Sequence, residues 1–125
     1  MNVLRLIAAT GVSLVALTAN AASDITEQSL EGCKIVAADA KNPTPTQSMK
    51  TGMCFGALQA ALDTGALLQW NKAWCTPPNT SRKQMIEQWV KWTKAHPTEM
   101  AKIDSAMGRI LTALPDIYPC KDAKK

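Results

Sequence analysis

The chain has 125 residues, of which 46% are hydrophobic and 19% are charged, and it carries a formal net charge of +4. This length allows one domain with a single modest core. The 14 basic residues are scattered, offset by 10 acidic residues and not accompanied by a nucleic-acid-binding motif, so the composition argues against nucleic acid as a partner.

The N-terminus has the three parts of a secretory signal peptide. A positively charged start is followed by an apolar run over residues 6–17 and by the small-residue motif Ala19-Asn20-Ala21. The apolar run is too short to span a membrane as a stable helix. We therefore expect residues 1–21 to be a signal peptide and residues 22–125 to form one helical domain in the periplasm, without membrane insertion after cleavage.

Helical periodicity predicts an all-α fold for the mature chain, with about four helices and no strand. The first two helices are expected over residues 25–40 and 48–70, because two prolines in residues 41–45 prevent one continuous helix. Three glycines in the second helix each reduce its stability, so we expect some of them to allow close helix packing: Gly52, Gly56 and Gly65.

The third helix has a recognisable start. Ser81 and Gln84 have the spacing of a capping box, in which the hydroxyl and the amide each satisfy a backbone N–H group. This helix is expected to end just before Pro97. A fourth helix is expected to begin at a Thr98 cap and to end at Pro115.

Four cysteines in a small exported chain favour two disulfides, because an oxidising compartment drives thiols to pair. Zinc is the rival interpretation, but the cysteine spacing contains no close pair and the chain has a single His. We therefore expect no metal and no cofactor. The cysteines are Cys33, Cys54, Cys75 and Cys120.

Helix geometry ranks the three ways in which these cysteines can pair. The length of the second helix separates Cys54 from Cys75 and makes that pairing strained. Short connections predict two antiparallel helix hairpins, in which Cys33 and Cys54 lie at matching heights. Cys75 and Cys120 lie at the two ends of the second hairpin. We therefore expect a small bundle stapled by the bridges Cys33–Cys54 and Cys75–Cys120.

A search for catalytic residues finds no convincing group. Four bridged cysteines leave no thiol nucleophile, and the single histidine, His96, precedes a proline at a helix end. Asp63 and Glu87 have no sequence partner that suggests an acid–base pair. The sequence also lacks a Gly-rich phosphate loop and a Gly-x-Ser-x-Gly elbow. We expect a protein that is not an enzyme.

The chain has four tryptophans, against one Phe and one Tyr. Trp89 is expected in the core of the bundle. Trp70, Trp74 and Trp92 could belong either to the core or to a protein interface, because tryptophans outside a core are common interface anchors.

Four segments follow one another along the mature chain: CFGALQAALD from Cys54, CTPPNTSRKQM from Cys75, WVKWTKAHP from Trp89 and YPC from Tyr118. In their order and spacing they resemble the Tai/Rap family of type VI secretion amidase immunity proteins. The resemblance covers nearly the whole mature chain. It departs from the family at Ala60, where glycine is frequent, and over residues 115–118, which lengthen the approach to the last cysteine.

The resemblance implies a small periplasmic helical protein that binds a cognate peptidoglycan amidase effector, blocks its cleft and protects the cell wall. Members of the family often act as homodimers, so a homodimer is a further expectation. An inhibitor of this kind needs a rigid scaffold and a protruding element rather than catalytic residues.

We expect the protruding element to be the loop over residues 71–80. The residues expected to contact the partner are Trp70, Asn71, Lys72, Trp74 and Asn79, with the two tryptophans as anchors. Two other functions remain open from the residues alone. One is a periplasmic stress chaperone that binds unfolded clients, and the other is a carrier that encloses a small apolar ligand.

Overall fold

The structure, a computed structural model, describes residues 24–121, and the expected signal peptide over residues 1–21 lies outside this range. All regular elements in the described range are helical, as predicted, and two disulfides staple them. Residues 24–37 form the N-terminal helix. The later elements are α2 (Pro45–Leu67), the 3-10 helix η1 (Trp70–Ala73), α3 (Arg82–Ala95), α4 (Pro97–Met100) and α5 (Ala106–Ile117).

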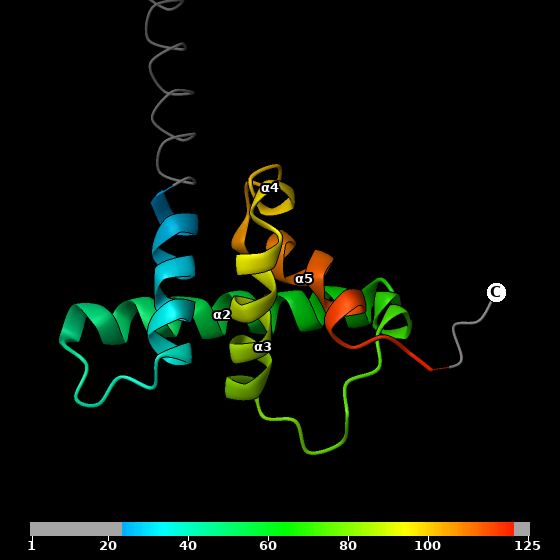
Figure 1. The fold of residues 1–125 in the computed structure, drawn as a ribbon, viewed down its shortest axis with the longest axis horizontal. Helices are drawn as coiled ribbons and strands as arrows, with labels where there is room; N and C mark the ends of the chain where they lie inside the picture. The colour runs from blue at the N-terminus through cyan, green and yellow to red at the C-terminus, as the bar shows by residue number, and fades with distance from the viewer. Residues whose placement is uncertain (1–23, 122–125) are drawn as a thin grey trace, which may run out of the picture.

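The long helix α2 organises the molecule. Figure 1 shows the N-terminal helix and α3 crossing α2 at different points along its length, while α5 and η1 lie toward its C-terminal end. The core forms where these helices meet, and its largest fully buried side chains come from each of the longer helices. They are Leu58, Ile86, Ile110, Leu114, Cys33 and Cys54.

A disulfide fixes the point where the N-terminal helix crosses α2. Cys33 and Cys54 are bonded, as expected, with Cα atoms 5.1 Å apart. Gly32 permits this close approach, because a Cβ atom there would collide with the backbone carbonyl of Lys50. The Nζ of Lys50 also lies 2.6 Å from a carboxylate oxygen of Glu31. The crossing is therefore held by a covalent bond, a glycine contact and an ion pair.

The glycines of α2 differ in their surroundings. Gly52 and Gly56 face open space, so neither allows a close helix contact. Gly65 is buried, and a Cβ atom there would collide with the indole ring of Trp74. Close packing therefore depends on Gly65 within α2 and on Gly32 of the helix that crosses it.

Capping residues set the starts of α2 and α3. The Thr44 hydroxyl accepts a hydrogen bond from the Gln47 backbone N–H, and Pro45 occupies the first turn, so α2 begins earlier than expected. The capping box of α3 is confirmed, because Ser81 and Gln84 exchange hydrogen bonds of 3.2 and 2.7 Å. No helix in the described range is long and apolar enough to cross a membrane.

The prediction of the fourth helix is wrong in both its start and its end. The chain instead forms the short α4, a break over residues 101–105, and α5. Carbonyl groups in the break accept hydrogen bonds from side chains. Asp104 accepts one from the distant Thr26 hydroxyl, and Ile103 accepts one from the nearby Arg109 guanidinium. Pro115 does not end α5, because it lies in the last turn and α5 continues to Ile117. The hydrogen bonds from Thr26 and Arg109 satisfy carbonyl groups that a continuous helix would have paired internally.

Ser105 rather than Thr98 caps the last long helix. Its hydroxyl accepts a 3.0 Å hydrogen bond from the Gly108 backbone N–H. Ser105→Ala is expected to lower the free energy of unfolding by about 1 kcal/mol in a urea titration. Thr98→Ala, which changes an exposed residue of α4, serves as the control and should stay within about 0.5 kcal/mol of the parent. Equal losses in both variants would contradict the break before α5.

Candidate functional site

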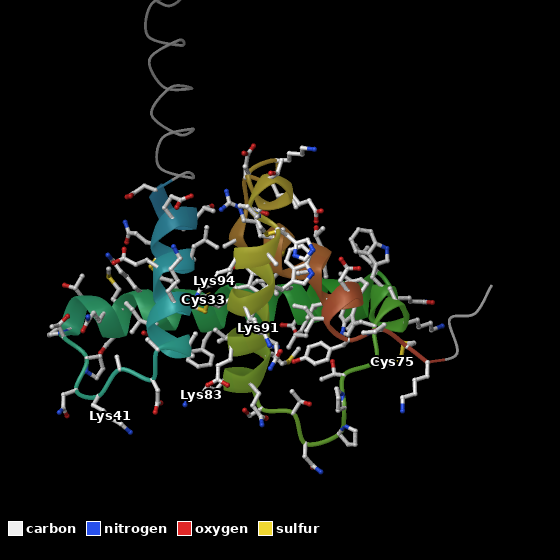
Figure 2. All side chains as sticks on the ribbon, in the orientation of Figure 1. Cys33, Lys41, Cys75, Lys83, Lys91 and Lys94 are labelled. Atoms are coloured by element: carbon white, nitrogen blue, oxygen red, sulfur yellow. A yellow bond between two sulfur atoms is a disulfide. The ribbon has the colours of Figure 1, made fainter. Side chains whose placement is uncertain are left out.

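The second disulfide anchors the loop that follows η1. Cys75 and Cys120 are bonded, as expected, with Cα atoms 4.9 Å apart. The Cys75 backbone N–H also donates a 2.7 Å hydrogen bond to the carbonyl of Tyr118. Figure 2 shows Cys75 where this loop meets the C-terminal segment. The start of the loop is therefore fixed to the chain segment after α5.

The loop itself extends away from the helices in Figure 1. Trp74 is buried at its start, with 6% of the side chain exposed. A turn forms at its tip, where the backbone N–H and the hydroxyl of Thr80 both donate to the carbonyl of Pro77. Asn79 adopts a positive φ of 66° in this turn, a conformation that Asn tolerates better than most residues. The Ser81 cap of α3 then fixes the other end of the loop.

The five residues expected to contact a partner fall into different environments. Trp70 and Lys72 are exposed on η1, which also contains Asn71, and Asn79 is exposed at the tip of the loop. Trp74 lies between these two groups, packed inside against α2. The structure thus places Trp74 in the core as the support of the segment, and it leaves Trp70 as the exposed tryptophan.

An apolar surface beside η1 was not identified from the sequence. Leu67 is 83% exposed, and Leu68 and Trp70 are each about half exposed. Leu68 and Trp70 line one side of a groove of about 520 Å³, whose other side comes from Met107 and Leu111 of α5. The pair Leu67-Leu68 just before a polar Gln69 was the available signal, but the expected continuation of α2 to Trp70 concealed it.

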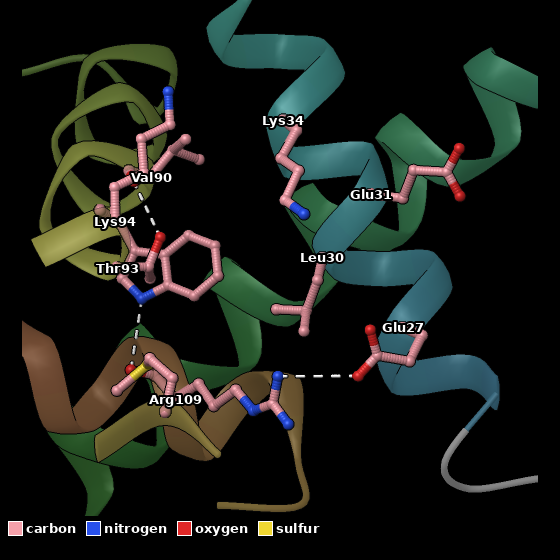
Figure 3. A pocket seen from close by; sticks show the side chains of 10 residues that line it. Glu27, Leu30, Glu31, Lys34, Val90, Thr93, Lys94 and Arg109 are labelled. Atoms are coloured by element: carbon pink, nitrogen blue, oxygen red, sulfur yellow. Dashed lines mark hydrogen bonds and ion pairs between the residues drawn. The ribbon is translucent and has the colours of Figure 1, made fainter. Parts of the chain in front are cut away.

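A second groove lies between the N-terminal helix and α3 and has a volume of about 570 Å³ (Figure 3). Its apolar lining comes from four side chains that are themselves largely buried, and its rim carries charges of both signs. The apolar residues are Leu30, Trp89, Val90 and Met100, and the polar ones are Glu27, Glu31, Lys34, Thr93, Lys94 and Arg109.

An ion-pair cluster links the first interhelical loop to the start of α3. The Nζ of Lys83 lies 2.7 Å from Asp39 and 3.6 Å from Glu87, and Figure 2 labels Lys83 near Lys41. The hydrogen bond and charge of Lys83, with the charge of Lys41, lower the pKa of Asp39. The hydrogen bond to Asp39 raises the pKa of Lys83. Both side chains are exposed to solvent, so this cluster is a solvated contact rather than a reactive site.

The residues considered for catalysis have structural roles here. All four cysteines are disulfide-bonded. The His96 ring stacks on Trp92 with centroids 4.0 Å apart, and its Nδ1 lies 2.9 Å from the Trp92 carbonyl at the end of α3. Asp63 accepts a hydrogen bond from the Gln59 side chain on the surface of α2. Within residues 24–121, no three His, Cys, Asp or Glu side chains form a group that could hold a metal.

The sequence matches a known protein family. A family model described as Rap1a immunity proteins matches residues 23–120. This range includes every helix described above and all four cysteines. Neither the comparison with curated proteins nor the comparison with solved structures found a match.

Proposed function

The chain belongs to the Rap1a immunity protein family, and we propose on this basis that it binds and inhibits a peptidoglycan amidase delivered by a type VI secretion system. The family indicates an immunity protein against a secreted effector. The amidase, the secretion route and the periplasm are the finer parts of the proposal. The family match over residues 23–120 is the observation that carries it.

The architecture suits inhibition by binding. Two disulfides tie together helices and loops that are far apart in the sequence, which reduces the conformational entropy lost on association. The loop over residues 74–81 is fixed at both ends and extends from the body. Blocking a cleft requires only such a rigid element, and we propose that η1 and this loop cover the amidase active site.

The carrier function has less support than the immunity function. A carrier would need an enclosed apolar cavity, whereas the two grooves described above are open at the surface, and one has a charged rim. The exposed leucines of the apolar surface would also suit a chaperone, but the family match favours a single dedicated partner.

An inhibition assay tests the proposal. The proposed mature chain, residues 22–125, is titrated into a candidate cognate type VI amidase, and cleavage of purified peptidoglycan fragments is followed by chromatography. We expect cleavage to fall in proportion to added protein and to stop near one equivalent. Undiminished cleavage at tenfold molar excess, or cleavage by this chain without the amidase, would contradict the proposed function.

Trp70 is the residue of η1 with the largest expected contribution to binding. It is 53% exposed and forms the apolar surface together with Leu67 and Leu68. Trp70→Ala should weaken amidase binding by about 2 kcal/mol, roughly thirtyfold, because a tryptophan that becomes buried against a partner contributes much of the binding energy. Ile25→Ala, at a residue 56% exposed on the N-terminal helix, is the control. Calorimetry that gives the two variants equal affinities would place the interface away from η1.

A further inference from the structure

We propose that the groove between the N-terminal helix and α3 binds an acidic segment of the effector, one in which an apolar side chain lies next to carboxylates. This inference rests on the proposed function, because it assigns a second contact surface for the same partner. It concerns a different part of the molecule from η1 and the loop that follows it.

The shape of the groove suits a single protein segment. Its two walls are helices that each cross α2 (Figure 1), and the side chains that line the groove between them are drawn in Figure 3. Leu30 from one wall and Val90 from the other provide the apolar lining, and Met100 from α4 adds to it. These side chains are at most 9% exposed and belong to folded elements, so the apolar lining is preformed.

The acidic side chains on the rim already have cationic partners. Glu31 pairs with Lys50 at 2.6 Å, and Glu27 pairs with the Arg109 guanidinium at 3.7 Å. Figure 3 shows the Arg109–Glu27 contact across one end of the groove. The Nε of Arg109 donates to the Ile103 carbonyl at 2.6 Å, which holds this guanidinium in place.

The lysines on the rim differ from these carboxylates. Across residues 24–121, no carboxylate oxygen lies within 4.0 Å of the Nζ of Lys34 or Lys94. The charge left without a partner at this groove is therefore positive and comes from both helical walls. Complementary carboxylates on a partner would speed association and fix its register.

The same charge pattern favours a protein segment over a uniform polyanion. A membrane or nucleic acid surface needs a broad positive face, whereas the cations without an ion-pair partner among the described residues of this groove are two lysines, and Glu27 and Glu31 stand beside one of them. A segment with an apolar side chain flanked by Asp or Glu matches the apolar lining and both lysines.

Neutralising the two lysines tests the inference. The double variant Lys34→Gln/Lys94→Gln removes both charges without placing a negative charge near a helix C-terminus, where it would reduce helix stability. We expect the Kd for the amidase to rise about tenfold and the dependence of Kd on salt concentration to become weaker. Thermal melts should show that the double variant folds as the parent does.

Lys91→Gln is the matched control. Lys91 is an exposed lysine of the same helix as Lys94, but it lies beside Trp92 and His96 rather than in this groove. Its Kd should stay within about twofold of the parent. If the unaltered chain binds the amidase and the double variant binds as Lys91→Gln does, the groove inference is overturned while the proposed function stands. If the unaltered chain does not bind, both fail.

Crosslinking identifies the chemistry of the occupant. A photo-reactive amino acid placed at position 34 should crosslink to the amidase, and mass spectrometry should find Asp or Glu within a few residues of an apolar side chain in the crosslinked peptide. Crosslinks confined to segments without acidic residues, or the absence of crosslinks in a complex that forms normally, would contradict the inference.

Discussion

Replacing Trp74 by alanine is expected to lower the free energy of unfolding by about 3–5 kcal/mol, the range for truncation of a buried tryptophan. Only 6% of this side chain is exposed, and its indole occupies the space that the absent Cβ of Gly65 leaves on α2. Truncation would leave a cavity beneath the start of the loop. The measurement is a urea titration followed by circular dichroism and tryptophan fluorescence.

The matched comparison for Trp74 is Trp70, four residues earlier. Trp70→Ala removes the same side chain from an exposed position and should change the free energy of unfolding by no more than about 0.5 kcal/mol. The two variants therefore distinguish a structural role from a binding role. Trp74→Ala should lose stability, whereas Trp70→Ala should lose affinity for the amidase. Equal stability of both variants would mean that Trp74 does not belong to the core.

Gly32→Ala is expected to lower the free energy of unfolding by about 2–3 kcal/mol, because the added methyl group collides with backbone rather than with a flexible side chain. The helices would have to separate at a point where Cys33 and Cys54 hold them together. The cost of this collision should exceed the gain in helix propensity on replacing glycine by alanine, which is about 1 kcal/mol.

Gly56→Ala provides the opposite expectation at a glycine of α2. A Cβ atom there meets open space, so only the propensity gain applies, and stability should rise by about 0.5–1 kcal/mol. Thermal melts and urea titrations of Gly32→Ala and Gly56→Ala measure the two changes in stability. A Gly32→Ala variant as stable as Gly56→Ala would show that the two helices do not approach closely at this crossing.

Much of the fold could be predicted from the sequence, because the signals were local. The Ser81 cap, the proline-rich connection after the first helix and the rise of about 1.5 Å per residue along α2 are properties of neighbouring residues. From them followed the helical class and the pairing of Cys33 with Cys54 and of Cys75 with Cys120.

The break after α4 could not be predicted in the same way. It depends on the hydrogen bond from Thr26 to the Asp104 carbonyl, which joins residues 78 positions apart. The sequence around Thr98 has a plausible cap, and nothing local indicates that a distant side chain will bond the backbone further on. Pro115 was misjudged because a proline in the last turn of a helix removes one hydrogen bond without ending the helix.

The candidate site was predictable only in part. The connection between η1 and α3 was recognised from its polar residues, its prolines and the tethered Cys75. The burial of Trp74 depends on Gly65, and the groove at Lys34 and Lys94 depends on how two helices cross α2. Contacts of this kind join residues from different helices, so the hydrophobic pattern along any one helix does not predict them.

Protection of living cells tests the central claim most directly. The proposed cognate amidase, directed to the periplasm of a susceptible host, should lyse cells that lack this chain. Cells that also produce residues 1–125 should grow normally, whereas cells that produce only residues 22–125, without the proposed signal peptide, should lyse. Lysis in the presence of residues 1–125, with the folded protein detected in the periplasm, would contradict the account.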